Sequence, residues 1–154
     1  MSLISKLVAS PTDPENKWYL CQCHCGATAF KIAHKSLESD SSSSPEPAPV
    51  VNCSCSICTV NGYLLIYVFK EQVRFIRGWD DLKAYEFASK TRKHKFCGVC
   101  GTSVAIDFLD LVPEGNVIGV NARVIQGLDL KKLNLMPLDG RAYQAEYNRE
   151  IKYE

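Results

Sequence analysis

The chain has 154 residues, of which 46% are hydrophobic and 23% are charged, and its formal net charge is +1. This composition is typical of a single soluble globular domain, and the near-neutral charge gives no global reason to expect nucleic acid or an anionic membrane surface as a partner. Apolar runs of about 18 residues are absent, so the sequence predicts no transmembrane helix.

The N-terminal half is predicted to contain a lead-in, a strand region and a loop. Residues 1–17 include two prolines and are predicted to be a poorly ordered lead-in without a secretory signal, so a cytoplasmic location is expected. A single domain is expected over residues 18–154. Alternating apolar residues predict strand structure over 18–32, with Gly26 as a turn or bulge. Residues 36–49, SLESDSSSSPEPAP, lack the large apolar side chains that offset ordering entropy and predict a flexible loop.

Short strands are also predicted along the rest of the chain. Their ranges are 63–69, 73–76, 82–88, 102–108 and 117–125. No long segment shows the period of an α-helix, although residues 127–135 could form a helical turn or two. The predicted fold class is therefore mainly β, a small sandwich or folded-over sheet, with Trp18 and Trp79 in its core.

The chain contains eight cysteines, and they fall into three clusters. In a reducing compartment, such close spacing is more typical of metal binding than of disulfides. The clusters are Cys21, Cys23 and Cys25; Cys53, Cys55 and Cys58; and Cys97 and Cys100.

The last cluster, in FCGVCGT, has the pattern of a zinc knuckle, in which glycines let the backbone curl so that amide N–H groups point at the sulfurs. A redox C-x-x-C would be followed by a helix, whereas a strand-like segment follows here. A closed four-cysteine site needs two more ligands. Residues i and i+2 share a face of a strand, so Cys23 and Cys25 fit, as do Cys21 and Cys23. Gly26 favours the first pair, and Cys21 is then a buried apolar residue, a third ligand or a redox group.

The remaining cluster comprises Cys53, Cys55 and Cys58. Three protein thiolates with an open fourth position are typical of a catalytic zinc, whose Lewis acidity stays available to a substrate. The alternative is a closed structural site, in which Cys21 or one of the histidines, His24, His34 or His94, supplies the fourth ligand.

The three motifs CHCGATAF, CSCSICTVNGYL and HKFCGVCGT occur in the order found in the glutathione-dependent formaldehyde-activating enzyme family, which includes centromere-protein-V-type proteins. VNARVIQGLDLKKL followed by DGR resembles the C-terminal portion of fungal-type members, so the resemblance spans about residues 18–141. It implies a β-tent fold of antiparallel sheets pinned by a structural zinc. The implied ligands are Cys23, Cys25, Cys97 and Cys100 for that zinc, and Cys53, Cys55 and Cys58 for a second, catalytic zinc.

The activity that this resemblance implies is the formation and breakdown of S-hydroxymethylglutathione, a carbon–sulfur lyase reaction with glutathione as cosubstrate. The expected ligand is therefore a small-molecule thiol adduct, with no membrane partner. The second candidate function is a non-catalytic, zinc-stabilised binding module for protein or, less favoured, nucleic acid.

Proton transfer in such a reaction would need a general acid or base, and His94 is the candidate. Alternatively, it is a surface histidine in the run KTRKHK, residues 90–95, which predicts a strand edge or hairpin. The same run could bind the carboxylates of glutathione. Asn61, Gly62 and Tyr63 follow the middle motif and are candidates to line the substrate cleft, although Asn and Gly also suit a plain turn.

Overall fold

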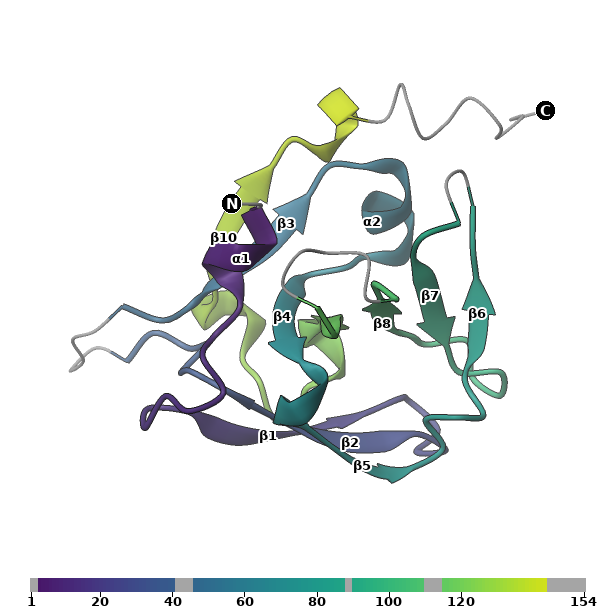
Figure 1. Cartoon of the computed structure of the whole chain (residues 1–154), viewed down its shortest axis with the longest axis horizontal. Helices are drawn as coiled ribbons and strands as arrows, with labels where there is room; N and C mark the ends of the chain where they lie inside the picture. The colour runs from purple at the N-terminus through teal and green to yellow at the C-terminus, as the bar shows by residue number, and fades with distance from the viewer. Residues whose placement is uncertain (1–2, 41–45, 88–89, 110–114, 144–154) are drawn as a thin grey trace.

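A computed structural model describes residues 3–40, 46–87, 90–109 and 115–143 (Figure 1). The described residues form two β-sheets and two short α-helices, which confirms the predicted mainly β class. The strands are β1 (Lys17–Gln22), β2 (Ala29–His34), β3 (Pro49–Cys53), β4 (Leu65–Phe69), β5 (Val73–Arg77), β6 (Lys83–Tyr85), β7 (Lys93–Phe96), β8 (Ser103–Asp107), β9 (Val117–Asn121) and β10 (Asn134–Leu138). The α-helices are α1 (Leu3–Leu7) and α2 (Ser56–Asn61), and 3-10 turns cover Lys70–Gln72, Ala122–Val124, Leu130–Lys132 and Gly140–Tyr143. No helix in these ranges is long and apolar enough to cross a membrane.

The smaller sheet has three antiparallel strands in the order β1-β2-β5 and lies along the bottom of Figure 1. The strand region predicted over residues 18–32 is the hairpin of β1 and β2, and Gly26 lies in its turn with φ +80°. Because side chains alternate along a strand, β1 directs Tyr19 and Cys21 inward and Trp18 and Leu20 outward.

The larger sheet has seven strands in the order β10-β3-β4-β9-β8-β7-β6. All its pairs are antiparallel except β10 with β3. Strand β4 is buried on both faces, which explains its continuous apolar sequence. Ile66 and Val68 belong to the core between the two sheets, whereas Leu65 and Tyr67 belong to a second core that α1 helps to cover.

Several elements differ from the sequence-based expectations. The helices, β3 and β10 were not predicted, and the strand predicted over 117–125 ends at Asn121 and continues as a 3-10 turn. The helical turn predicted within 127–135 is limited to Leu130–Lys132, because β10 begins directly afterwards. Pro137 lies in β10, and it is tolerated there because β10 is an edge strand.

The expectation that Trp18 lies in the core is wrong. Its side chain is 46% exposed on the outer face of β1, where the guanidinium carbon of Arg74 lies 4.1 Å from the centroid of the indole ring. Trp79 is partly buried as expected, with its ring 5.3 Å from that of Phe30.

The two segments predicted to be poorly ordered are only partly described. Within residues 1–17, α1 places Ile4 and Leu7 against the second core. Residues 41–45 of the predicted loop lie outside the described residues. On either side of them, Leu37 is fully buried and the Ala48 N–H donates to the Ser36 carbonyl over 2.8 Å.

Candidate active site

Four of the eight cysteines meet where the two sheets come together. Cys23 and Cys25 lie in the turn between β1 and β2, and Cys97 and Cys100 lie in the turn between β7 and β8. Their four sulfur atoms all lie within 4.8 Å of one another, and the Cys25 sulfur is 3.7 Å from both the Cys23 and the Cys97 sulfur. Zn–S bonds of about 2.3 Å in a tetrahedron require sulfur–sulfur distances of about 3.8 Å. These residues therefore fit a zinc ion that joins the two sheets.

Backbone and side-chain donors surround the sulfurs of this four-cysteine cluster. The Thr28 N–H donates to the Cys23 sulfur over 3.3 Å, and the Val99 N–H donates to the Cys97 sulfur over 3.4 Å, as the knuckle motif predicts. Hydrogen bonding by the Thr102 hydroxyl, 3.1 Å from the sulfur of Cys100, lowers the pKa of that thiol to about 5. All eight cysteines are free, so disulfides do not account for the pattern.

Cys21 is the cysteine that the first motif leaves over. It lies on β1, fully buried between the two sheets, and burial raises the pKa of its thiol to about 12. Of the three alternatives given for Cys21, this setting matches the buried apolar residue, because a neutral thiol packs in a core as a small hydrophobic group. The pair that joins Cys97 and Cys100 is Cys23 and Cys25, as expected, but for a different reason, because both residues lie in a turn beyond the strand.

The other three cysteines form a compact group at the junction of β3 and α2. Cys53 is the last residue of β3, Cys55 is the N-cap of α2, and Cys58 lies within α2. Residues three apart on a helix share a face, so the tight turn into α2 aligns Cys55 with Cys58. The three sulfurs lie within 4.8 Å of one another, and hydrogen bonds from the thiols of Cys55 and Cys58 lower the pKa of Cys53.

Three convergent sulfurs, one of them favoured as a thiolate, form a donor set that suits zinc. Within the described residues, no fourth cysteine, histidine or carboxylate joins the group. His24 lies beside the other cluster, where its N–H donates to the Thr102 hydroxyl. His34 is buried with Nδ1 3.1 Å from the Lys35 carbonyl oxygen. Neither of these histidines therefore closes the three-cysteine group.

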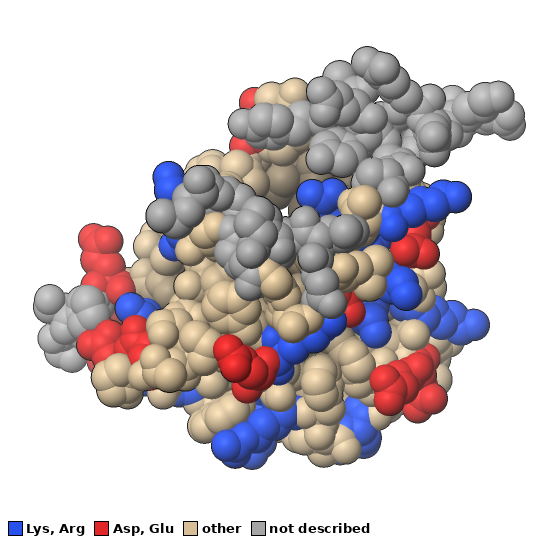
Figure 2. Space-filling view, in the orientation of Figure 1, with Lys and Arg blue, Asp and Glu red and all other residues tan. Residues whose placement is uncertain are grey.

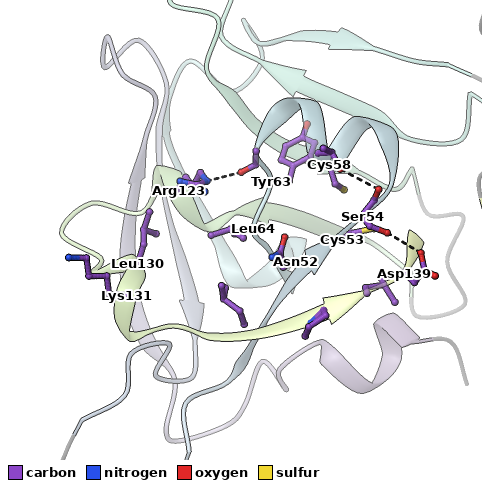
Figure 3. Close-up of a pocket in the computed structure, with 15 residues that line it drawn as sticks. Asn52, Cys53, Ser54, Cys58, Tyr63, Leu64, Arg123, Leu130, Lys131 and Asp139 are labelled. Atoms are coloured by element: carbon purple, nitrogen blue, oxygen red, sulfur yellow. Dashed lines mark hydrogen bonds between the residues drawn. The ribbon is translucent and has the colours of Figure 1, made fainter. Parts of the chain in front are cut away.

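The three-cysteine cluster borders a pocket of about 820 Å³ (Figure 3). Cys53 and Cys58 contribute to its wall, together with Gly62 and Tyr63, two of the three cleft residues predicted after the middle motif. Asn61 is not among the lining residues. Figure 3 shows that Cys53 and Asp139 lie toward one end of the pocket and Lys131 toward the other. The pocket therefore places sulfurs and a cation at opposite ends.

Arg123 is the second cation of the pocket, and sequence reasoning missed both it and Lys131 as site residues. Arg123 follows β9, and its Nε donates to the Gly62 carbonyl over 2.8 Å. This hydrogen bond fixes the end of α2, where Gly62 adopts a left-handed conformation (φ 63°). The signals in the sequence were the motifs NAR, which contains Arg123, and DGR, which contains the pocket residue Asp139.

The C-terminal segment packs directly on the three-cysteine cluster. The Ser54 hydroxyl donates to Asp139 Oδ1 over 3.1 Å and accepts from the Arg141 N–H over 3.3 Å. Gly140 lies so close that a Cβ there would overlap the Cys53 sulfur and come within 2.9 Å of the Cys55 Cβ. One side of the cluster is therefore covered by this segment, while Cys53 and Cys58 border the pocket.

His94 lies on β7 and is only 4% exposed, so the surface alternative for this residue is wrong. Its Nδ1 is 3.4 Å from the Tyr63 hydroxyl, and Tyr63 separates it from the pocket. Burial, assisted by the charge of Arg92, lowers the pKa of His94 to about 4, so the ring is neutral at pH 7.

The basic run at residues 90–95 contributes β7 of a hairpin with β6, as one alternative predicted. Lysines and arginines gather over these strands at the right of Figure 2. Lys95 packs its ammonium 4.8 Å from the centroid of the Trp79 ring. The residues that line the pocket do not include this run, so the cations available to a ligand there are Arg123 and Lys131.

Two cysteine clusters, one between sheets and one beside a pocket, define a mainly β protein with two candidate metal centres. Residues 18–133 match the family model described as glutathione-dependent formaldehyde-activating enzyme, and the chain belongs to this family. It is also similar to a crystal structure of a Rhodobacter sphaeroides protein, with 25% identity and a TM-score of 0.57 over 77% of this chain and 97% of that one. No curated protein matches the sequence.

Proposed function

We propose that this protein is a zinc-dependent carbon–sulfur lyase that forms and breaks the adduct of an aldehyde, such as formaldehyde, with glutathione or a related thiol. The observation that carries the proposal is the three-cysteine cluster, which has no fourth protein ligand among the described residues and borders a pocket with cations at its far end. Membership of the glutathione-dependent formaldehyde-activating family supports the same chemistry.

The four-cysteine cluster is proposed to hold a structural zinc. Its ligands come from turns of the two different sheets, Cys23 and Cys25 from one and Cys97 and Cys100 from the other. A metal there would fix the relative position of the sheets, in keeping with the β-tent fold that the family resemblance implies. Its donors and their spacing match those of structural zinc sites, which are four-coordinate and closed.

The reaction adds the S–H of a thiol across the C=O of an aldehyde. A carbon–sulfur bond forms, and the thiol proton ends on the former carbonyl oxygen; the reverse reaction returns both fragments. Zinc bound by Cys53, Cys55 and Cys58 would supply Lewis acidity that favours the thiolate over the thiol near neutral pH. The pocket residues orient the thiol: Arg123 and Lys131 attract a carboxylate at the end away from the sulfurs.

His94 is proposed as a positioning residue. Its neutral ring lies within hydrogen-bonding distance of the Tyr63 hydroxyl, and Tyr63 forms part of the pocket wall directly after α2. The Tyr63 N–H also donates to the Cys58 carbonyl over 3.0 Å, so the orientation of this tyrosine is coupled to the three-cysteine cluster. His94 therefore acts on the site through Tyr63 rather than by contact with substrate.

The test combines metal analysis with exchange kinetics. Purified protein should contain two zinc ions per chain and accelerate glutathione–formaldehyde exchange, which NMR saturation transfer measures directly. Cys53→Ser should contain one zinc and lose the acceleration, whereas Cys21→Ala, a cysteine change outside both clusters, should retain both. Unchanged zinc content in Cys53→Ser would contradict the second metal site. Full zinc content without exchange for any low-molecular-weight thiol would favour the non-catalytic binding module.

A further inference from the structure

One long side of the pocket is apolar and comes from a single segment. Leu130 lies in the 3-10 turn before β10, and Leu135 and Pro137 lie on β10 itself. Leu135 and Pro137 are two residues apart, so they share one face of the strand, while Met136 between them packs into the second core. Leu130 is 37% exposed and Leu135 is 43% exposed, which leaves apolar surface open to a ligand.

This apolar wall lies between the two polar ends of the pocket. Figure 3 shows β10 running from the end that carries Leu130 and Lys131 to the end that carries Cys53 and Asp139. The register agrees, because β10 pairs in parallel with β3 and Leu138 is the partner of Cys53. A ligand with its sulfur at the cysteines and its anion at Lys131 would therefore lay its middle portion along the wall.

Glutathione complements this wall poorly, because each arm between its sulfur and a carboxylate contains a peptide group. Peptide groups placed against leucine and proline side chains lose hydrogen bonds to water without replacing them. An aliphatic chain would instead gain free energy from each buried methylene. The pocket volume of about 820 Å³ also leaves room for a chain of several carbons.

The β10 part of the wall, with Leu135 and Pro137, lies past the region that matches the family model. The family model matches residues 18–133, and β10 begins at Asn134. The cysteine clusters lie within the matched region, so the residues for the common chemistry and the β10 residues of the wall are separate in the sequence.

We propose that the thiol accepted by this site is an amphipathic one, with an apolar segment between its sulfur and its carboxylate. The inference rests on the proposed function, since it names the substrate class of the same pocket. The three-cysteine cluster receives the sulfur, Arg123 and Lys131 receive the carboxylate, and Leu130, Leu135 and Pro137 contact the aliphatic segment between them.

The test measures binding of ω-mercapto acids of increasing length to the zinc-loaded full chain by titration calorimetry. The series is 3-mercaptopropionate, 6-mercaptohexanoate and 8-mercaptooctanoate, in which the sulfur and the carboxylate stay constant. Affinity should rise about two- to fourfold per added methylene, as expected for partial to full burial of each group. Glutathione should bind more weakly than the longest acid. S-hexylglutathione carries its apolar group on the sulfur instead of between the sulfur and the carboxylate. It therefore tests whether the position of the apolar group matters.

Leu135→Ser is the informative variant, because Leu135 is half exposed on an edge strand and its replacement leaves the core intact. It should flatten the dependence on chain length. Val60→Ser is the matched control, since Val60 is 83% exposed on α2 and does not line the pocket. Equal affinity along the series, equal slopes for the two variants, or a gain confined to S-hexylglutathione would each overturn the inference.

Failure of the inference and failure of the proposed function give different results. Glutathione–formaldehyde exchange without any chain-length dependence of binding would leave the lyase intact and remove the amphipathic substrate. Chain-length-dependent binding without carbon–sulfur exchange for any of these thiols would keep the pocket assignment and remove the lyase.

Discussion

The two cysteine clusters use the same donor atom in opposite structural settings. The four-cysteine cluster brings together turns that are more than seventy residues apart, with Cys25 and Cys97 separated by 72 positions. The three-cysteine cluster lies within one stretch from Cys53 to Cys58, which β3 and α2 already hold in place. A metal in the first cluster would therefore close a long loop and join two sheets, whereas a metal in the second adds little to chain connectivity. Ligand position, more than ligand type, distinguishes the proposed structural site from the proposed reactive one.

The largest expected effect is a stability difference between one cysteine change in each cluster. Cys97→Ser should lower the free energy of unfolding by several kcal/mol, comparable with the entire stability of an ordinary domain, because structural zinc binding and folding are coupled. Cys53→Ser should leave the melting temperature within a few degrees of the unchanged protein. Calorimetric melting with zinc analysis on both variants measures this. Similar losses in the two variants would contradict the division into structural and reactive sites.

The next effect concerns His94, which lies on β7 three residues before Cys97 and is in contact with Tyr63. Its pKa falls from 6.5 to about 4 in the fold, so protonation favours the unfolded chain. This stability is fully present above pH 6.5 and is lost as the pH falls toward 4, up to about 3 kcal/mol. His94→Gln should remove that loss.

Urea unfolding at intervals from pH 7 to pH 5, with zinc in excess, measures the slope for both proteins. Acid protonation of the cysteines and of the buried His34 acts on both and cancels in the difference. Parallel pH dependences would show that His94 does not contribute. A second measurement, the pH profile of exchange activity, separates positioning of Tyr63 from simple stability, since only positioning lowers turnover at pH 7.5.

The sequence was sufficient to predict both clusters. Cysteines that bind one metal ion commonly occur two or three residues apart, and such spacings can be recognised directly in the sequence. It was less informative about their surroundings. Cys23 and Cys25 were assigned to one face of a strand, whereas they lie in a turn. The i, i+2 spacing is compatible with both settings, so it could not distinguish them. Trp18 was placed in the core by its type, although its position in the alternation of β1 directs it outward.

The pocket could not be predicted from the same spacings. Its wall exists because β10 pairs with β3, and the first partners in that register, Asn134 and Pro49, are far apart in the sequence. Its cations come from two further segments, one after β9 and one in the turn before β10. Non-local pairing of this kind leaves no periodic signal, and the proline in β10 argues against a strand when it is judged locally.

Gly140 offers a sharper test of the three-cysteine setting. A Cβ at this position would overlap the Cys53 sulfur, and the Gly140 N–H lowers the pKa of that thiol by hydrogen bonding, as a smaller contribution beside Cys55 and Cys58. Gly140→Ala should therefore weaken zinc binding at this cluster about 10- to 100-fold, the range typical of supporting contacts around metal ligands. Competition with a chromophoric chelator measures the affinity.

The control for Gly140→Ala is Arg141→Ala, which keeps the backbone N–H that donates a hydrogen bond to the Ser54 hydroxyl. Its zinc affinity at the three-cysteine cluster should be unchanged, and so should that of the four-cysteine cluster in both variants. If Gly140→Ala binds both zinc ions as tightly as the unchanged protein, the C-terminal segment does not support the reactive site.

The smallest expected effect separates Cys21 from both clusters. Cys21→Ala removes one buried sulfur from the core between the sheets and should cost about 1 kcal/mol of stability, in line with the loss of a methyl-sized group. Both zinc ions and full exchange activity should remain, because the thiol of Cys21 is held neutral by burial and a zinc ligand must be a thiolate. Denaturant unfolding gives the stability, and metal analysis gives the content. Loss of one zinc would instead identify Cys21 as a ligand of a site that lacks a fourth ligand among the described residues. Cys21→Ala therefore tests the contrast between the two clusters most directly, although its expected effect is the smallest.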